Sequence, residues 1–378
     1  MINKSDLKIG LALSGGGSRA MAYHLGCLRA LHKLDLLDKV ELISTVSGGS
    51  VLGAMYAYGE GSFEQFEEDV RNELKKGFAK RAFFDWVFKG KIFLNIINFL
   101  VVLCSWVLYS IMSIIGLGSK TQRLLMAPRP FNRTNSMESV FNKVLFKGKK
   151  LNSKTRGGTS IVINSCELGT KTAFRFGNNM VSNWIFGTVD PSQISIGTAV
   201  AASAAYPLLL PAINRQFDFQ KNGKKNVKRV TLTDGGIYEN LGITPLFPDR
   251  SPEFGYAGPK VNLIVACDAD HGPTFHSANF QLMYTRISGC FESLMKRIQA
   301  SNFKILHKFK DSGEIQGFVL SYLGQVDERL PTIPKDLIRR EDIIGYPTNF
   351  FAMDDKNIEK LSMRGEQLTT LLAGHYLS

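Results

Sequence analysis

The pattern of apolar and polar positions near the N-terminus gives the order strand, turn, helix twice within sixty residues. Residues 8–13 form a short apolar run, and residues 21–34 then place Met and Leu at a helical spacing of three to four. Residues 40–45 are a second apolar run, and residues 51–58 again favour a helix. This repeat is typical of parallel strands joined by helices, and it predicts an α/β domain.

Later parts of the chain continue this pattern. Residues 261–267 are an unbroken apolar run, which suits a strand that is buried on both faces of a sheet. Residues 221–226 are polar and contain Asn and Gly, so they predict the tip of a hairpin. Together these runs predict an α/β fold with a mainly parallel central sheet. Further strands are expected at 159–164 and 229–233, and helices around 193–205, 279–307 and 355–373.

The longest apolar segment carries no charge from residue 92 to residue 119, which is long enough to cross a bilayer as a helix. Both of its ends are basic, so the positive-inside rule assigns no orientation. A helix in the plane of the membrane, a re-entrant hairpin, or a buried or lid helix fits equal flanks better. The flanking cations are Lys89, Lys91, Lys120 and Arg123.

The 378 residues have the composition of a globular protein, with 44% hydrophobic residues. Their charge, however, is distributed unevenly along the chain. The net charge is +13, and the section from Arg71 to Arg156 alone holds 17 Lys and Arg against three Asp and Glu. Such a section is expected to face an anionic partner, either a membrane surface or nucleic acid. The five cysteines are odd in number and lack a C-x-x-C spacing, so a reducing compartment is expected. The N-terminus lacks a signal-peptide core, so secretion by that route is not expected.

A glycine-rich turn, Gly15-Gly16-Gly17-Ser18-Arg19, stands between the first strand and the first helix. Consecutive glycines bring backbone N–H groups close to a ligand, and a helix N-terminus favours an anion. That anion is either the oxyanion of an acyl transfer or a pyrophosphate, since Gly15, Gly17 and Ala20 satisfy a loose dinucleotide fingerprint. The second strand ends without the acid that would hold a ribose, which weakens the dinucleotide alternative.

Two further turns follow apolar strands and carry reactive side chains. Ser47 stands where a sharp strand-to-helix turn would expose a hydroxyl, with Gly49 relieving the crowding of that turn. Asp234 precedes Gly235 and Gly236, which allow its carboxylate to approach another loop, although an Asp-Gly hairpin turn is the structural alternative. With the glycine-rich turn, these residues predict an oxyanion loop, a nucleophile and a base.

The three motifs together resemble those of the patatin-like phospholipase family. The resemblance implies a three-layer α/β fold and a Ser–Asp dyad, with Ser47 as the nucleophile and Asp234 as the base. It covers roughly residues 7–60 and 158–270, including the similar segment 202–207, and extends to the C-terminal part, but it does not cover residues 60–156. It also implies an oxyanion loop of Gly15, Gly16, Gly17 and Arg19, with Gly49, Gly235 and Gly236 supporting the elbow and the base loop.

The sequence departs from the family pattern at two positions, and neither departure removes a reactive group. Thr45 replaces the first glycine of the elbow motif, and Ala20 stands where a glycine often follows the arginine. His24 is the one candidate for a third member of a triad, but a lone histidine on a helix is more often a packing residue. Asp268 and Asp270 are expected to cap a loop, and no metal or cofactor is expected.

The order of the motifs constrains the apolar segment. Ser47 precedes it and Asp234 follows it, so a single crossing would place the dyad on opposite sides of a bilayer. The segment is therefore expected to bind an anionic membrane surface or to pack as a lid, and nucleic acid is not expected. The expected membrane contacts are Lys89, Lys91, Trp106, Lys120 and Arg123.

These features predict a single domain, residues 1–378, that carries a basic and apolar insertion at residues 60–156. Its expected activity is that of a serine esterase, which cleaves phospholipid or another lipid ester through an acyl-enzyme. The expected location is the cytoplasm, in peripheral contact with a membrane. Two alternatives remain: a dinucleotide-binding enzyme that uses the glycine-rich turn, and a non-catalytic membrane scaffold.

Overall fold

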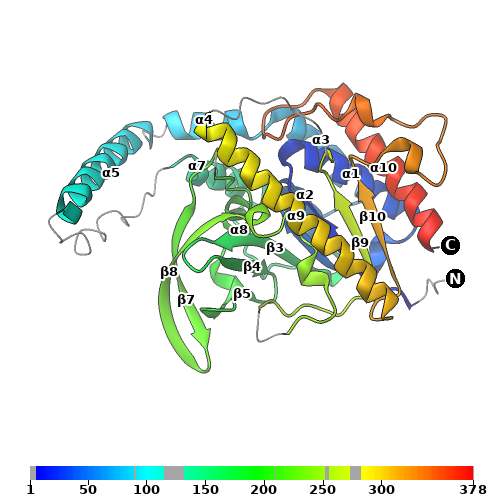
Figure 1. Cartoon of the computed structure of the whole chain (residues 1–378), viewed down its shortest axis with the longest axis horizontal. Coiled ribbons are helices and arrows are strands. Elements are labelled where there is room, and N and C mark those ends of the chain that lie inside the picture. Colours follow the sequence, from blue (N-terminus) through cyan, green and yellow to red (C-terminus); the bar gives the residue numbers. More distant parts are fainter. Residues whose placement is uncertain are drawn as a thin grey trace.

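A ten-stranded sheet runs through the described part of the chain, and its two halves differ in strand direction. The computed structural model describes residues 6–88, 91–114, 132–207, 209–251, 255–272 and 282–377 (Figure 1). Five neighbouring strands, in the order β10-β9-β1-β2-β3, are all parallel. Their bounds are β1 Ile9–Leu13, β2 Val40–Val46, β3 Ser160–Glu167, β9 Leu263–Asp268 and β10 Gly317–Tyr322.

The other half of the sheet is antiparallel and closes on itself. Strand β8 ends the series β4-β5-β6-β7-β8 and returns to pair with β3, where Ser165 faces Asp234. The prediction of a mainly parallel sheet is therefore wrong for this half. Apart from the link between β6 and β7, which contains helix α8 (Ile196–Ser203), its strands are joined by connections too short for a crossover helix, which dictates antiparallel pairing. Their bounds are β4 Thr172–Gly177, β5 Val181–Asn183, β6 Gly187–Val189, β7 Ile213–Lys221 and β8 Lys224–Asp234.

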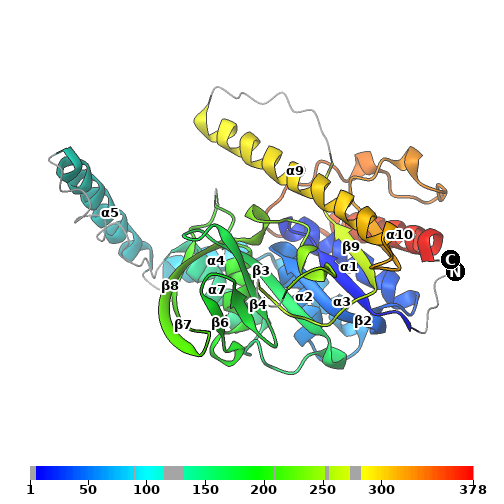
Figure 2. The same cartoon turned by 60° about the horizontal axis from the view of Figure 1, so that its bottom comes forward.

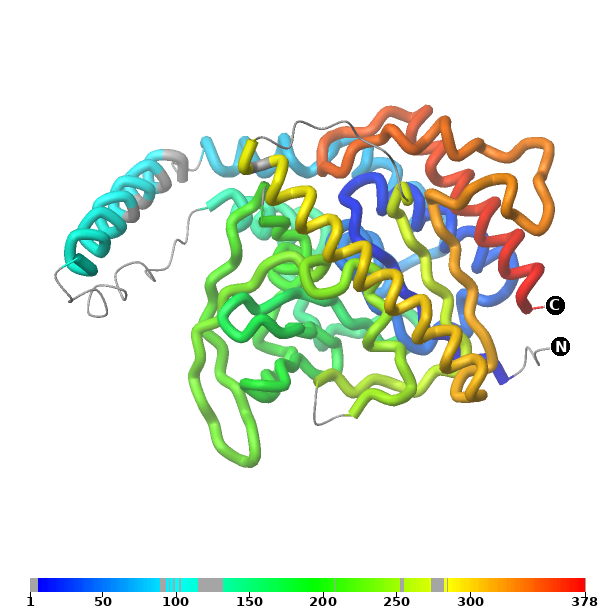
Figure 3. Tube along the Cα trace, in the orientation of Figure 1, coloured from blue at the N-terminus to red at the C-terminus, as the bar shows by residue number. Residues whose placement is uncertain are grey.

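The longest hairpin, β7–β8, forms an arm that reaches away from the rest of the sheet (Figure 3). Its tip is Asn222-Gly223, and both residues have positive φ, 50° and 73°. Two central residues with positive φ make the turn type whose twist matches that of the strands. The polar stretch 221–226 therefore forms the hairpin tip that the sequence predicts.

Both faces of the parallel half are buried. Leu11 and Leu13 of β1 belong to the apolar core beneath helices α1 and α10, whereas Ala12 faces a second core that contains Leu306 and Phe309 of α9. Figure 2 shows α9 on the face opposite α1 and α2. The unbroken apolar runs of β1 and β9 follow from this double burial. The helices are α1 Gly17–Lys33, α2 Gly48–Tyr58, α3 Phe63–Lys76, α8 Ile196–Ser203, α9 Met283–Asp311 and α10 Asp355–Leu377.

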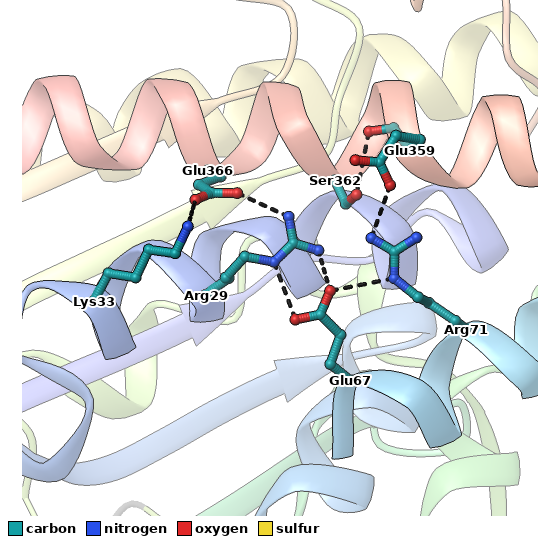
Figure 4. A network of polar contacts seen from close by, with 7 residues as sticks. All are labelled: Arg29, Lys33, Glu67, Arg71, Glu359, Ser362 and Glu366. Carbon is teal, nitrogen blue, oxygen red and sulfur yellow. Dashed lines mark hydrogen bonds and ion pairs between the residues drawn. The ribbon is translucent and has the colours of Figure 1, made fainter. Parts of the chain in front are cut away.

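Helices α1 and α10 approach each other closely because each has a glycine at the contact. A Cβ atom on Gly26 would overlap the carbonyl oxygen of Ser362, and one on Gly365 would overlap that of Tyr23. A network of ion pairs then joins both helices to α3 (Figure 4). The pairs connect Arg29 to Glu67 and Glu366, Lys33 to Glu366, and Arg71 to Glu67 and Glu359.

The basic and apolar section contains helices α4 Ala79–Phe88, α5 Lys91–Ile114 and α7 Arg133–Val140. In Figures 1 and 2, α5 projects away from the body of the molecule. Its large apolar side chains, Trp106 among them, are exposed. Within the described ranges, no helix has both the length and the hydropathy that a membrane crossing requires. Of the expected membrane contacts, Lys89, Lys120 and Arg123 lie outside the described residues, and only the backbone of Lys91 is described.

Candidate active site

The glycine-rich turn opens helix α1 in a conformation that only glycine adopts readily. Gly16 and Gly17 have φ of 144° and 60°. The N–H of Ser18 donates to the carbonyl oxygen of Asn349 at 2.7 Å. Among the described residues, the N–H groups of Gly16 and Gly17 have no hydrogen-bond acceptor. Two backbone donors at a helix N-terminus are therefore available to an anion.

Ser47 lies in the sharp turn between β2 and α2. Its φ of 50° and ψ of −117° are strained for a residue with a side chain, by about 1–3 kcal/mol. Only 7% of its surface is exposed. A Cβ atom on Gly48 would overlap the Gly17 carbonyl, and one on Gly49 would overlap that of Leu13. These glycines therefore let the serine turn pack directly against the glycine-rich turn.

Thr45, which replaces the first glycine of the elbow motif, has a structural role in the same turn. Its hydroxyl accepts a hydrogen bond from the Ser50 hydroxyl at 3.0 Å and donates to the carbonyl of Val162 at 3.3 Å. The Ser47 N–H donates to the Ser203 hydroxyl at 2.9 Å. The turn is thus fixed by side-chain hydroxyls on the neighbouring elements.

Asp234 ends strand β8, and the closure of the antiparallel half brings it to Ser47. Its carboxylate accepts a hydrogen bond from the Gly236 N–H at 2.7 Å, and the Ser47 side chain lies near enough to lower its pKa. Burial of the carboxylate, which is 3% exposed, raises its pKa to about 7, and its interactions with the Gly236 N–H and the Ser47 side chain oppose that shift. A Cβ atom on Gly235 would overlap the Asn164 carbonyl, so this position also requires a glycine.

The structure brings Ser47, Asp234 and the glycine-rich turn into one cluster. A Cβ atom on Gly15 would lie 3.3 Å from the Ser47 Cβ. Arg19 points elsewhere: it donates to the carbonyl oxygens of Ala269, at 3.0 Å, and Tyr346, at 3.1 Å, and burial lowers its pKa to about 10. Arg19 therefore anchors the glycine-rich turn to the loops that contain Ala269 and Tyr346. Trp106 lies on α5 and is not part of the cluster.

The remaining titratable candidates are held by structural contacts. The His24 ring is bound to the carbonyl oxygen of Ser14 at 3.0 Å, beneath the glycine-rich turn, and not to Asp234. Asp268 accepts from the Asp270 N–H at 3.0 Å and contacts Gln299, and Asp270 pairs with Lys296. These are the contacts of loop capping. The described residues include no group of His, Cys, Asp and Glu that could hold a metal.

Sequence reasoning missed two residues that complete the cluster. The Asn240 side-chain oxygen lies beside both Gly15 and Gly236, 2.7 Å from where a Cβ on Gly236 would be. The backbone carbonyl oxygen of Asn240 accepts a hydrogen bond from the Gly15 N–H at 3.0 Å. The backbone of Asn349 covers the start of α1. A bound dinucleotide would place its pyrophosphate there, so this contact disfavours the dinucleotide-binding alternative. Asn240 follows Asp234 closely, but no local pattern points to Asn349.

Comparison with known proteins agrees with this geometry. The family model described as patatin-like phospholipase matches residues 11–247, which include both Ser47 and Asp234. The chain belongs to the patatin-like phospholipase family. A search of curated proteins finds no match.

Solved structures resemble this patatin-like chain in fold. Human GIVD cytosolic phospholipase A2 is 13% identical, with a TM-score of 0.52 over 99% of this chain and 59% of that one. A second structure of the same human protein is 12% identical, with a TM-score of 0.52 over 99% of this chain and 62% of the other. VipD from Legionella pneumophila is 14% identical, with a TM-score of 0.42 over 100% of this chain and 70% of that one. The chain thus spans about three fifths of the human protein's length.

Proposed function

We propose that this patatin-like protein is a lipid acyl hydrolase that cleaves carboxylic esters with a dyad of Ser47 and Asp234. The observation that carries the proposal is that the Ser47 side chain lies close to the buried Asp234 carboxylate, beside two backbone N–H groups without an acceptor among the described residues. Family membership supports a lipid ester as the substrate class.

In the first half of the reaction, Asp234 takes the hydroxyl proton of Ser47 while the serine oxygen attacks the ester carbonyl. The raised pKa of Asp234, about 7, makes it a stronger base than an ordinary aspartate. The N–H groups of Gly16 and Gly17 donate to the oxyanion, where each such donor is worth roughly 10²–10³ in rate. Collapse of the intermediate breaks the ester bond, returns the proton to the leaving alcohol and leaves an acyl-Ser47 ester.

In the second half, Asp234 takes a proton from water, which attacks the acyl-Ser47 carbonyl. The same N–H groups stabilise the second oxyanion. Collapse then releases the fatty acid and returns the proton to Ser47. The cycle needs a nucleophile, a base and an oxyanion site, and no metal takes part in it.

We propose further that the basic and apolar section holds the protein peripherally on an anionic membrane surface. A helix that is apolar on all sides needs an apolar partner, and α5 exposes such side chains away from the body. The surrounding excess of Lys and Arg fits anionic headgroups. Lys89, Lys91, Lys120, Arg123 and Trp106 are the proposed contacts.

The dyad is tested by labelling with a fluorophosphonate, a reagent that phosphonylates activated serines. One structure of the human relative is a complex with methyl gamma-linolenyl fluorophosphonate. We expect rapid labelling of the wild type, none in Ser47→Ala, and a rate lowered by about 100-fold in Asp234→Asn. Ser301→Ala, an exposed serine on α9, is the matched control and should label normally.

Labelling that survives Ser47→Ala, in a variant with an unchanged melting temperature, would contradict the assignment of the nucleophile. A wild type that neither labels nor hydrolyses soluble esters would favour the non-catalytic scaffold. Thermal stabilisation by a dinucleotide would favour the dinucleotide-binding alternative.

A further inference from the structure

The N-terminal half of α9 carries a stripe of exposed apolar side chains, here called the α9 stripe. It consists of Met283, Ile287, Cys290 and Leu294. Their spacing of three and four residues places them on one side of the helix. Met283, Ile287 and Leu294 are 68%, 50% and 60% exposed. Figure 2 shows this part of α9 standing clear of the sheet.

The opposite side of α9 is fixed to the body, so the stripe is not the result of a loosely held helix. Leu306 and Phe309 are buried in the core on that face of the sheet. Further along, Lys296 pairs with Asp270, Gln299 contacts Asp268, and Phe291 packs edge-on against Tyr206. Apolar side chains on a firmly docked helix that remain in contact with water mark an interaction surface.

Charge on α9 identifies the kind of partner that fits the stripe. The helix holds six Lys and Arg against two Asp and Glu. Arg286 and Arg297 are exposed on the same half of the helix as the stripe. An apolar stripe beside basic side chains is the pattern of helices that lie in the interface of anionic membranes. A hydrophobic protein partner would not require this excess of basic charge.

The position of α9 connects it to the candidate active site. The helix contacts the turn Gly235–Ile237, which follows Asp234, and the loop 268–272 through Asp268 and Asp270. That loop holds the glycine-rich turn, because the Ala269 N–H donates to the Ser14 hydroxyl at 2.8 Å and Arg19 donates to its carbonyl. In both Figures 1 and 2, the N-terminal end of α9 and helix α5 lie toward the same end of the molecule.

We propose that the α9 stripe is a second membrane-binding surface, which inserts into an anionic lipid bilayer next to the active site. The inference rests on the proposed lipid hydrolase function, and it names the surface from which the substrate enters. Because Ser47 is only 7% exposed, a lipid needs an opening among the segments around the site. Because α9 contacts both the turn after Asp234 and the loop 268–272 that holds the glycine-rich turn, it is the element that lipid binding would displace.

The experiment uses the full chain with a fluorescent NBD group on Cys290, which lies in the stripe. Cys290 and Cys104 are the exposed thiols, and the other three are buried, so Cys104→Ser leaves one reactive position. With vesicles that contain phosphatidylglycerol, we expect NBD emission to rise about twofold or more and to shift to the blue. The matched control moves the label two residues along, to the other side of the helix, with Cys290→Ser and Glu292→Cys at an exposed position, and should change little.

A functional measurement accompanies the fluorescence. Ile287→Gln with Leu294→Gln should lower hydrolysis of vesicle phospholipid about tenfold and leave hydrolysis of p-nitrophenyl butyrate unchanged. The control pair is Ile185→Gln with Val227→Gln, which are exposed apolar side chains near the β7–β8 arm and should alter neither activity.

The outcomes separate this inference from the proposed function. An unchanged NBD signal at Cys290, in protein that still labels with fluorophosphonate, would overturn the inference alone. A stripe variant that changes the sedimentation mass without changing vesicle binding would assign the stripe to a protein contact and also overturn it. Loss of labelling in the wild type would instead overturn the proposed function, whatever the NBD signal.

Discussion

At the scale of single residues, the candidate site depends on a carboxylate that is buried at an energetic cost. Asp234 has one N–H donor and the Ser47 side chain as its partners, and these offset only part of the desolvation that raises its pKa. A shift from the ordinary value of 3.8 to about 7 corresponds to roughly 4 kcal/mol against the charged form. The same property that destabilises the charged site makes Asp234 an effective base near neutral pH.

The pH dependence of the reaction follows from this shift. Because the base acts as the carboxylate, kcat/KM should rise tenfold per pH unit below about 7 and level off above it. Hydrolysis of p-nitrophenyl butyrate between pH 5 and 9 measures the profile, with circular dichroism to verify folding at each pH. Asp234→Asn should lack this midpoint. A wild-type profile that is already flat above pH 5 would contradict the role of Asp234.

At the scale of elements, close backbone approach at glycines fixes how the helices pack. Gly26 of α1 and Gly365 of α10 each face a carbonyl oxygen of the other helix. The ion pairs of Figure 4 connect α3 to both of these helices. Since α1 begins at the glycine-rich turn, the α1–α10 contact also sets the direction of the helix whose N-terminus faces Ser47.

Alanine at either glycine tests this packing. Gly26→Ala and Gly365→Ala should each destabilise the protein by about 1–3 kcal/mol, because the added methyl group has no space. Urea unfolding measures the change. Gly374→Ala, in the same helix α10 but with no atom within 4 Å of the added Cβ, is the control and should stabilise by up to about 1 kcal/mol. Equal effects at Gly365 and Gly374 would refute the close approach.

At the scale of the whole molecule, charge and exposed apolar surface are concentrated on one section. The section from Arg71 to Arg156 carries all of the net positive charge and the projecting helix α5, while the sheet carries the candidate site. Such separation suits a protein that works at a lipid surface, where attraction of about 1 kcal/mol per basic residue adds to apolar burial.

Charge reversal tests that separation. Glutamate at Lys89, Lys91, Lys120 and Arg123 should weaken binding to phosphatidylglycerol vesicles by at least about tenfold at low salt, measured by sedimentation. The matched control reverses Lys224, Lys225, Lys228 and Arg229 on the β7–β8 arm, which changes the net charge equally. Equal losses in both variants would mean that binding depends only on net charge and not on the proposed section.

Local features of the site were predictable from the sequence, because backbone conformation at a turn depends on adjacent residues. The positive φ of Gly16 and Gly17 and the strained turn at Ser47 follow from short motifs. The apolar runs likewise located β1, β2 and β9. Apolar periodicity, by contrast, does not encode which strands pair, so the antiparallel half was not foreseen beyond the hairpin tip at 221–226.

The sequence alone determined which residues can act: a hydroxyl on a tight turn, an acid beside two glycines, and amides at the start of a helix. Only the tertiary structure decided that they meet. Strand β8 returns to pair with β3 and carries Asp234 to Ser47, and the contacts of Asn240 and Asn349 depend on the same long-range packing. Pairing over such separations is set by the summed burial and hydrogen bonding of the whole sheet, which no short motif contains.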